Sequence, residues 1–468
     1  MAGWTTWRDA LEALVEEIRG CDPRDVLGVG GCVLRCVAAF ERELYARVDD
    51  RAYQGLRTSV EEACADVFRR ADGEVLADEH VDALRAILEQ ALAGVDAAGD
   101  ERERFAVAVR VAGDALDFVL GDRFVACLLA RHPQRTVALA PRDALPLADP
   151  PLKKLMGSLS ARPSALTPRT DRFRRLALVP ATAFDVVLHL DRGRVLDKAL
   201  AKDRRIGTAL PLDSIDDLTM DEAPDSFSNV RPKDAERARD DAIRLMETAA
   251  AEGASMLVLP ELCLEEASCR DVHDWLLEDR RLLVVAAGSA HTRGDDEGGC
   301  LRNRCHVFVG GRPIFAHDKN MRFALKRKDG VKSEDIETEP LCVNVVLSGA
   351  WSMTTLICKD VLAKPLADLL ERLFVKVVLV PACSDRLDDF RGSIHGLVTH
   401  AQSVVAVANI AGERPGDGGE DDAEIALIAF PMKKDADRLL SVRRGEAAAP
   451  VLVSRAFDGT VLDVKRIT

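Results

Sequence analysis

The sequence has no uninterrupted hydrophobic run of membrane-spanning length. The best candidate, Leu176 to Leu190, is broken by Pro180 and Asp185, whereas a spanning helix needs about 20 consecutive apolar residues. The N-terminal stretch is not that of a secretory leader either, because it is amphipathic and repeatedly acidic. These absences predict a cytoplasmic protein that does not associate with membranes.

Positive charge is in deficit. The chain has 64 Lys and Arg residues against 78 Asp and Glu residues, for a net charge of −14. Binding to nucleic acid or to an anionic membrane needs clustered Lys and Arg, so this balance argues against both kinds of partner. We therefore expect a small-molecule substrate.

Cysteine, in contrast, is plentiful, with 12 residues in a chain of 468. Without a secretory leader these are expected to be free thiols in a reducing compartment. A hydrophobic content of 47% with 30% charged residues is that of a globular protein rather than a disordered one. The length exceeds that of one ordinary core and predicts two domains or three.

The composition divides the chain into three segments. Residues 1–131 carry apolar residues at helical spacing, which predicts an all-helical bundle domain of unknown role with helices near 4–20, 24–48, 51–70, 74–95 and 101–131. Residues 132–202 are rich in proline and predict a connecting region with two short strands, at 176–179 and 184–190. Residues 203–468 alternate between strand and helix patterns. That alternation predicts an α/β domain with helices layered on a two-sheet core.

Three predicted strands of the last segment end in a residue able to do chemistry. Glu261 follows the apolar run 256–259, Lys319 follows the second arm of a hairpin whose turn is Gly310-Gly311, and Cys358 follows the strand that includes Thr354. Residues at strand ends are held rigidly and face the space beyond the sheet. We therefore expect these three side chains to meet. Earlier in this segment, residues 213–229 are predicted to form a polar, Asp-rich loop.

A carboxylate, an ammonium and a thiol together suffice for acyl transfer. A thiol has a pKa of about 8.5 and becomes a good nucleophile only when a base takes its proton or a cation favours the thiolate. In this reading Glu261 is the base and Cys358 the nucleophile. Lys319 stabilises the oxyanion, with the backbone N–H of Lys359 as a second donor. No metal and no cofactor are required.

The motifs that carry these residues resemble the nitrilase, or carbon–nitrogen hydrolase, superfamily. The matching pieces are VLPE at Glu261, the Asn303-to-Lys319 hairpin region, LICKD at Cys358, and the later strands 378–384 and 404–412. The resemblance covers somewhat over half of the chain. It implies an αββα sandwich, a Glu–Lys–Cys triad, a thioester acyl-enzyme and a homo-oligomer.

The resemblance also implies a second glutamate shortly after the lysine. This chain has a charged insertion there, residues 326–339, in which Glu334 is the first candidate and Glu337 the second. Asn303 and Cys383 are expected to line the pocket. Family members usually carry an aromatic residue after the nucleophile, and here that residue is Lys359.

Other sites remain open from the sequence. Cys383 is a rival thiol at a neighbouring strand end, but it has no Glu and Lys pair of its own. Cys300, Cys305 and His306 could suggest zinc, although their spacing is not a usual ligand pattern. His395 or His400 with Cys358 would make a papain-like protease, which needs its nucleophile at a helix N-terminus.

Two functions follow. The first is a hydrolase, or an acyl transferase, that cleaves a non-peptide C–N bond in an amide, carbamoyl compound or nitrile through a Cys358 thioester. The second is a regulatory or conflict-system protein in which the sandwich senses a ligand and the helical domain binds a protein partner.

Overall fold

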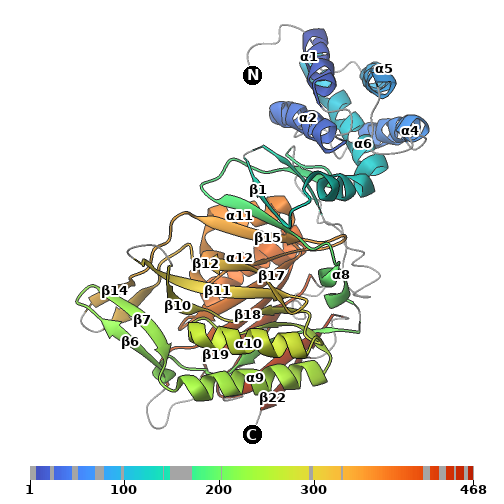
Figure 1. The fold of residues 1–468 in the computed structure, drawn as a ribbon. Helices are drawn as coiled ribbons and strands as arrows, with labels where there is room; N and C mark the ends of the chain where they lie inside the picture. Colours follow the sequence, from blue (N-terminus) through green and yellow to red (C-terminus); the bar gives the residue numbers. More distant parts are fainter. Residues whose placement is uncertain are drawn as a thin grey trace. The chain divides into compact units, whose positions relative to one another are not determined.

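The computed structural model divides the chain into two compact units, shown in Figure 1. Unit 1 comprises Met1–Arg135, Leu139–Asp149 and Ser164–Thr182, and unit 2 comprises Thr136–Ala138, Pro150–Pro163 and Ala183–Thr468. The structure describes residues 7–21, 26–44, 51–68, 78–95, 100–140, 142–147, 171–201, 203–294, 299–327, 330–414, 422–431, 439–446, 449–457 and 462–466.

The described elements of unit 1 up to residue 131 are helices. They are α1 (Trp7–Arg19), α2 (Val26–Ala39), α3 (Glu41–Leu44), α4 (Arg51–Phe68), α5 (Asp78–Gly94) and α6 (Glu101–Arg131). The longest of them, α6, contacts the other five, and the side chain of Asp100 caps its start by accepting a hydrogen bond from the Glu103 N–H. The helix predicted over 24–48 is interrupted at Phe40, and residues 45–48 lie outside the described part of the chain.

Unit 1 also contains two short strands, β2 (Ala144–Pro146) and β3 (Leu176–Leu178), which pair antiparallel. The sequence predicted β3, but as part of a connecting region. Instead Leu176 and Ala177 are buried, and β3 packs against α2 and α6. The strand therefore belongs to the core of unit 1. Residues 148–170 of the proline-rich stretch lie outside the described residues.

Unit 2 is mixed α/β and is built on two large sheets. Among the described residues the first has eight strands, in the spatial order β1 (Thr136–Leu139), β4 (Asp185–Leu190), β15 (Cys342–Leu347), β16 (Ser352–Thr355), β17 (Val377–Cys383), β18 (Val404–Ile410), β19 (Glu424–Ala429) and β20 (Leu439–Arg443). Its middle strands β16, β17 and β18 run parallel and are buried along their whole length.

The second sheet also has eight described strands. Its path is β10 (Ala290–Arg293), β11 (Leu301–Val309), β9 (Val284–Ala286), β8 (Ala254–Val258), β5 (Arg205–Leu210), β21 (Val451–Ala456) and β22 (Leu462–Arg466), with β12 (Arg312–Asp318) paired to β11. The predicted hairpin is confirmed, because Gly310 and Gly311 connect β11 to β12 with φ of 64° and 73°.

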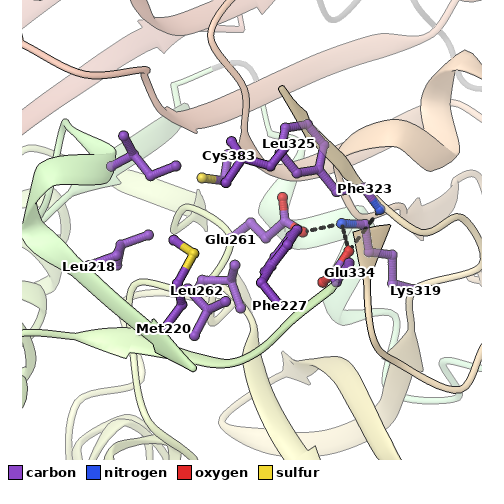
Figure 2. A pocket seen from close by; sticks show the side chains of 12 residues that line it. Leu218, Met220, Phe227, Glu261, Leu262, Lys319, Phe323, Leu325, Glu334 and Cys383 are labelled. Carbon is purple, nitrogen blue, oxygen red and sulfur yellow. Dashed lines mark hydrogen bonds and ion pairs between the residues drawn. The ribbon is translucent and has the colours of Figure 1, made fainter. Parts of the chain in front are cut away.

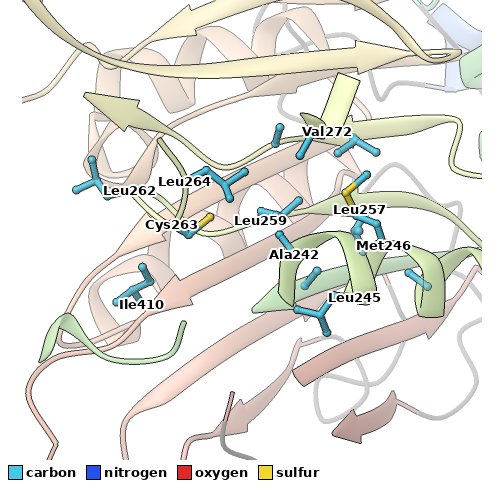
Figure 3. Packing of buried hydrophobic residues seen from close by; sticks show 14 of the residues in the cluster. Ala242, Leu245, Met246, Leu257, Leu259, Leu262, Cys263, Leu264, Val272 and Ile410 are labelled. Carbon is cyan, nitrogen blue, oxygen red and sulfur yellow. The ribbon is translucent and has the colours of Figure 1, made fainter. Parts of the chain in front are cut away.

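The two sheets contact each other, and helices pack on the second one. Strands β5 and β8 touch β17 and β18 of the first sheet, while α9 (Ala235–Ala251) contacts β5, β8 and β21, and α10 (Glu266–Glu278) contacts α9, β10 and β12 (Figure 1). Leu245 and Met246 of α9 and Leu257 of β8 share one buried cluster, seen in Figure 3. The cluster continues through Leu262 next to the candidate site.

The remaining helices of unit 2 are α8 (Val195–Ala199), α11 (Lys364–Leu373), α12 (Asp388–Gly396) and three short turns at Ile215–Asp217, Cys358–Leu362 and Leu397–Ala401. Helix α11 presents Leu366, Leu369, Leu370 and Leu373 to the interior. Contacts with α12 and with the turns at 358–362 and 397–401 anchor this helix. None of the helices among the described residues is both long and apolar enough to pass through a bilayer.

A smaller four-stranded sheet corrects the prediction of a polar loop over 213–229. Its order is β13 (Ala324–Arg327), β14 (Gly330–Glu334), β7 (Ser226–Pro232) and β6 (Leu218–Glu222). Leu218, Phe227 and Val230 are buried in this sheet. The many Asp and Ser residues between them concealed this apolar face in the sequence.

The boundary predicted at residue 203 is also wrong. Strand β4 pairs in parallel with β15 along its whole length, from Asp185 opposite Cys342 to Leu190 opposite Leu347. Leu188 and Leu190 are buried. Unit 2 therefore includes β4, which the proline-rich composition around it had assigned to a connecting region.

Candidate functional site

Glu261 lies in a tight turn that leaves β8 and crosses toward the first sheet. Its N–H donates to the Ala382 carbonyl in β17 at 3.3 Å. The next residue, Leu262, has a φ of 61°, and Gly288 packs so closely that an added Cβ would lie 2.4 Å from the Pro260 carbonyl oxygen. Backbone strain of this kind persists only where the surroundings enforce it. The carboxylate is thus fixed in position, with 1% of the residue exposed.

Lys319 follows β12 and lies between two carboxylates. Its Nζ donates to Glu261 Oε1 at 2.6 Å and to Glu334 Oε2 at 2.7 Å. Its backbone N–H donates to the Asn303 carbonyl at 2.9 Å, and its ammonium lies 5.7 Å from the centroid of the Phe323 ring. Two of the three ammonium N–H groups are engaged by these carboxylates, which leaves one for another acceptor.

Glu334, at the end of β14, is the second glutamate that enters the site. Its Oε1 accepts from Asn303 Nδ2 at 2.8 Å and from His291 Nε2 at 3.0 Å. The Val230 N–H donates to His291 Nδ1 at 3.0 Å, so that nitrogen carries no proton and Nε2 is the donor to Glu334. The other candidate, Glu337, instead accepts backbone N–H groups of Thr338 and Glu339.

Cys358 begins a short 3-10 helix, three residues beyond the end of β16. The sequence placed it at the strand end itself; the chain in fact leaves the strand at Thr355 and turns, which gives Cys358 a φ of 48°. Its Sγ lies 3.6 Å from the Cys383 carbonyl oxygen, and 2% of the residue is exposed.

The carboxylate of Asp360 joins the cysteine turn to the lysine turn. It accepts from the Ile357 N–H at 3.3 Å and from the Asn320 N–H at 3.0 Å. His317 Nε2 lies 3.2 Å from the same carboxylate. One buried side chain therefore fixes the backbone on both sides of the site.

The two glutamates differ in their pKa. Burial raises the pKa of Glu261 above its ordinary value and the nearby Glu334 adds to this, although Lys319 opposes it. Burial would also raise the pKa of Glu334, but the charge of Lys319 and the hydrogen bond from His291 hold it well below its ordinary value. These directions favour an ionised Glu334 beside Lys319 and make Glu261 the carboxyl better suited to exchange a proton.

The charge of Glu261 raises the pKa of both Lys319 and Cys358, which favours a charged amine and a neutral thiol. Burial would lower the pKa of Lys319, but Glu261 and Glu334 raise it well above its ordinary value. Burial raises the pKa of the Cys358 thiol, and the charge of Glu261 adds to this more than Lys319 opposes it. A thiolate favoured at rest by Lys319, which the sequence suggested, is therefore not supported.

A hollow of about 320 Å³, counting the part open to solvent, adjoins the Glu–Lys–Glu network. Its lining residues are Ile215, Leu218, Met220, Phe227, Val230, Glu261, Leu262, Lys319, Phe323, Leu325, Glu334 and Cys383. Figure 2 shows Lys319 between the two glutamates, with one Glu261 oxygen facing it and the other turned toward the side of Cys383. That second oxygen, Oε2, accepts no hydrogen bond from the described residues.

The other sequence candidates lie as follows. Cys383 lines the hollow, whereas Cys358 and Asn303 are not among its lining residues. Asn303 was expected to line the pocket; instead it is buried, and its Nδ2 donates to both Glu261 and Glu334. The Lys359 side chain points to the Arg322 carbonyl, 3.5 Å from its Nζ.

The alternative sites do not assemble. Cys305 is buried on β11 whereas the neighbouring Cys300 is exposed, and among the described residues no three His, Cys, Asp or Glu side chains could hold a metal ion. Of the two histidines considered as partners of Cys358, His400 instead lies 3.4 Å from Glu371 of α11.

Sequence reasoning missed His291 and Asp360 as parts of the site. His291 lies on the edge strand β10 and meets Glu334 only because β14 folds back beside β7. No local pattern indicates that contact. Asp360 could have been noticed, because it follows the nucleophile by two residues in a motif already singled out.

Comparisons with known proteins found similar solved structures but no similar family model or curated sequence. No protein-family model matches the chain, and no curated protein matches it. A crystal structure of an amidase from Nesterenkonia sp. is similar at 14% identity, over 54% of this chain and 89% of that chain, with a TM-score of 0.38. A variant of the amidase from Nesterenkonia sp. AN1, with the acetamide moiety of fluoroacetamide added covalently at its active-site cysteine, gives the same four values.

A cysteine-to-alanine variant of the same Nesterenkonia sp. AN1 amidase is similar at 15% identity, over 54% of this chain and 90% of that chain, with a TM-score of 0.35. At these identities and TM-scores the likeness carries no argument about activity, which rests on the geometry of the site. This variant and a cysteine-to-serine variant of the same protein are described as amidases from the nitrilase superfamily.

Proposed function

We propose that unit 2 is a carbon–nitrogen hydrolase that cleaves an amide or a related non-peptide C–N bond through a thioester at Cys358. One observation carries the proposal: a buried Lys319 is held between two glutamates of opposite pKa shift, beside a thiol whose pKa responds to both Glu261 and Lys319. Buried charges are costly unless they are paired, and strongly perturbed pKa values cluster at functional sites.

The first step is a proton transfer coupled to attack. Glu261 Oε2 has no hydrogen-bond donor among the described residues, and the nearby Cys358 thiol lowers the pKa of the Glu261 carboxyl slightly against the larger effect of burial. The thiol proton passes to Glu261 as the sulfur bonds to the carbonyl carbon. Because the pKa of the thiol is raised, general-base catalysis is needed rather than a preformed thiolate.

The attack moves the C=O electron pair onto oxygen, and the resulting oxyanion needs donors. The third N–H of Lys319 and the backbone N–H of Lys359 fill this role in the proposal. Glu334 keeps Lys319 charged through the reaction, since its own pKa is held low. Asn303 holds both glutamates and so acts as a positioning residue.

Collapse of the tetrahedral adduct breaks the C–N bond. The leaving nitrogen takes the proton from Glu261, which frees the carboxylate and leaves the acyl group on sulfur. A water molecule then gives its proton to Glu261 and attacks the thioester. The carboxylic acid departs and the proton returns to the Cys358 sulfur. An amine in place of water would give acyl transfer by the same steps.

The contacts between the sheets and the helices of unit 2 support, in part, the αββα sandwich that the motifs imply. We propose that unit 2 has this sandwich arrangement and that the protein forms a homo-oligomer. We also propose that the helices of unit 1 bind a protein partner.

The test is to identify the thiol that carries the acyl group. The protein is incubated with a panel of simple amides and nitriles, stopped in acid, and its intact mass is measured. The expected adduct is present in the unsubstituted chain and in Cys383→Ala but absent in Cys358→Ala. An adduct that persists in Cys358→Ala and maps to Cys383 overturns the assignment.

A ligand sensor with little turnover is the second candidate, because Cys358 is 2% exposed and is not among the residues that line the hollow. Burst kinetics distinguish the hydrolase from the ligand sensor. A hydrolase releases product over many turnovers, whereas a sensor stops at one equivalent or binds without an adduct.

A further inference from the structure

We propose, resting on the function proposed above, that the substrate is an amide or nitrile whose acyl group is uncharged and apolar, and that the hollow beside Glu261 holds this group. This selects among the substrate classes that the sequence left open. It disfavours carbamoyl amino acids and amides of dicarboxylic acids, whose acyl halves carry a carboxylate.

The walls of the hollow are the apolar face of the small sheet. Leu218 and Met220 come from β6 and Phe227 and Val230 from β7, while Leu325 comes from β13. Figure 2 shows Leu218, Met220 and Phe227 on one side of Glu261, with Cys383 and Leu325 across from them. An acyl chain that enters here leaves water for contact with hydrocarbon.

The polar side chains of the same strands have partners away from the hollow. Asn229 Nδ2 donates to Asp221 Oδ2 at 2.7 Å, and Lys332 Nζ donates to Glu222 Oε2 at 2.5 Å. None of these four residues is among those that line the hollow. Apart from Glu334 at the end of β14, the residues by which this sheet lines the hollow are apolar.

The floor of the hollow offers no counter-charge to a carboxylate on the acyl group, because its ammonium is already shared by two carboxylates. Among the described lining residues the one ammonium is that of Lys319, which already donates to Glu261 and Glu334. Two carboxylates beside one ammonium repel a further carboxylate. A substrate ammonium would have to lose its water against Leu and Phe side chains, which is unfavourable.

The hollow is narrow. Of the roughly 320 Å³ that it encloses together with open solvent, about 20 Å³ is wide enough for a water-sized group, so a longer acyl chain has to extend toward solvent or displace the side chains of the wall. Each methylene that it buries should tighten binding about fourfold. We therefore expect affinity to rise with chain length until the hollow is full.

The test uses three amides of similar length and different charge: hexanamide, adipamic acid and 6-aminohexanamide. Binding to full-length Cys358→Ala, which cannot form the thioester, is measured by calorimetry near neutral pH. Hexanamide is expected to bind at least about tenfold tighter than either charged analogue. Equal or tighter binding of a charged analogue, or no binding of any of the three, overturns the inference.

A charge reversal locates the acyl group. In the same background Met220→Lys should weaken hexanamide and strengthen adipamic acid, because it places a cation in the wall. Met321→Lys is the matched control, since Met321 is 37% exposed and does not line the hollow. If Met220→Lys leaves the ranking of the three amides unchanged, the acyl group lies elsewhere. The series on Cys358→Ala alone stays decisive if Met220→Lys fails to fold.

The unsubstituted enzyme distinguishes this inference from the function on which it rests. If Cys358 forms an adduct but turnover favours adipamic acid, the acyl preference fails and the hydrolase stands. If hexanamide binds yet none of the three amides acylates Cys358, the hydrolase fails and the apolar binding site stands.

Discussion

In the proposed function Glu261 and Glu334 have different roles beside the Lys319 ammonium, because the pKa of Glu261 is raised and that of Glu334 is lowered. Glu261 has an oxygen without a hydrogen-bond donor among the described residues. Both oxygens of Glu334 accept hydrogen bonds, from Lys319, Asn303, His291 and the Phe323 N–H. A carboxylate so fully bonded is a poor proton carrier, which is why the two are not interchangeable.

Substitution of Glu334 tests this division. Glu334→Gln should lower kcat by about 10²-fold or more, because Lys319 loses the counter-ion that keeps it charged and in place. Glu337→Gln is the control and should change kcat little, because its carboxylate bonds only to adjacent backbone. Steady-state kinetics of both variants decide the matter. A larger loss in Glu337→Gln would show that the wrong glutamate was chosen.

The free energy of unfolding should also depend on the charge of Glu334. The folded pKa of Glu334 is depressed, so its charge stabilises the fold above the pKa of an unfolded glutamate, and this contribution is lost as pH falls through the folded value. Urea unfolding should therefore show Glu334→Gln less stable than the unsubstituted chain at neutral pH. The difference should shrink in acid. A constant difference across pH would exclude the ionic origin.

The pH dependence of catalysis reports the other glutamate. Glu261 acts as a base only when ionised, and its pKa is raised above the ordinary value of 4.5. The acid limb of kcat/KM should therefore lie above that value. A pH–rate profile with a non-ionising amide measures it. A limb at or below 4.5 would mean that the proton passes through another group.

At the scale of elements, the site depends on two crowded turns. One follows β8 at Glu261 and Leu262, where Gly288 has a φ of 68° and packs against Pro260. The other is at Cys358, where Asp360 holds the backbone. Both follow regular strands, 254–258 and 352–355, which the sequence predicted at 256–259 and 353–357.

Gly288→Ala should damage the first of these turns. Its Cβ would lie 2.4 Å from the Pro260 carbonyl oxygen and 2.7 Å from Cys263 Sγ, and its backbone is left-handed. Gly253→Ala is the control, because its φ is 80° but no atom lies within 4 Å of the added carbon. Left-handed backbone alone costs about 1–2 kcal/mol. Denaturant unfolding should show a larger loss for Gly288→Ala, with a loss of activity that the control lacks.

The sequence predicted elements well where the pattern was local. Helix α6 has the predicted bounds of 101–131, and the hairpin through Gly310 was found from its glycines. Strands β6 and β7 were missed because their few apolar residues, Leu218, Met220, Phe227 and Val230, lie among many polar and acidic residues. Helix α10 was not predicted either, although Val272 and Leu276 lie on its buried side. Contacts such as His291 to Glu334 depend on folding and leave no local pattern.

For the molecule as a whole, the pairing of β4 with β15 determines which part of the chain can fold as a separate fragment. This strand covers one side of β15 with an unbroken parallel register. Without it, the backbone groups of β15 would form an open edge, which favours aggregation. The first residue of a stable fragment is therefore expected near 183 and not at 203.

Two fragments test this expectation. Residues 183–468 should give a folded, soluble product with the circular dichroism of a mixed α/β protein, whereas residues 203–468 should aggregate or unfold. Size-exclusion chromatography and thermal melting of both measure the difference. If 203–468 folds as well as 183–468, β4 is dispensable and the boundary drawn from the sequence was adequate.

The Asp360 carboxylate has a consequence for how this scaffold can change. Because it fixes the backbone at Asn320 and at Ile357 directly, the separation of lysine and nucleophile does not depend on the chain that runs between them. That chain carries β13 and β14, and so a wall of the hollow. A designer could substitute Leu325, the apolar residue by which this hairpin lines the hollow, and change which groups fit there while Lys319 and Cys358 keep their places.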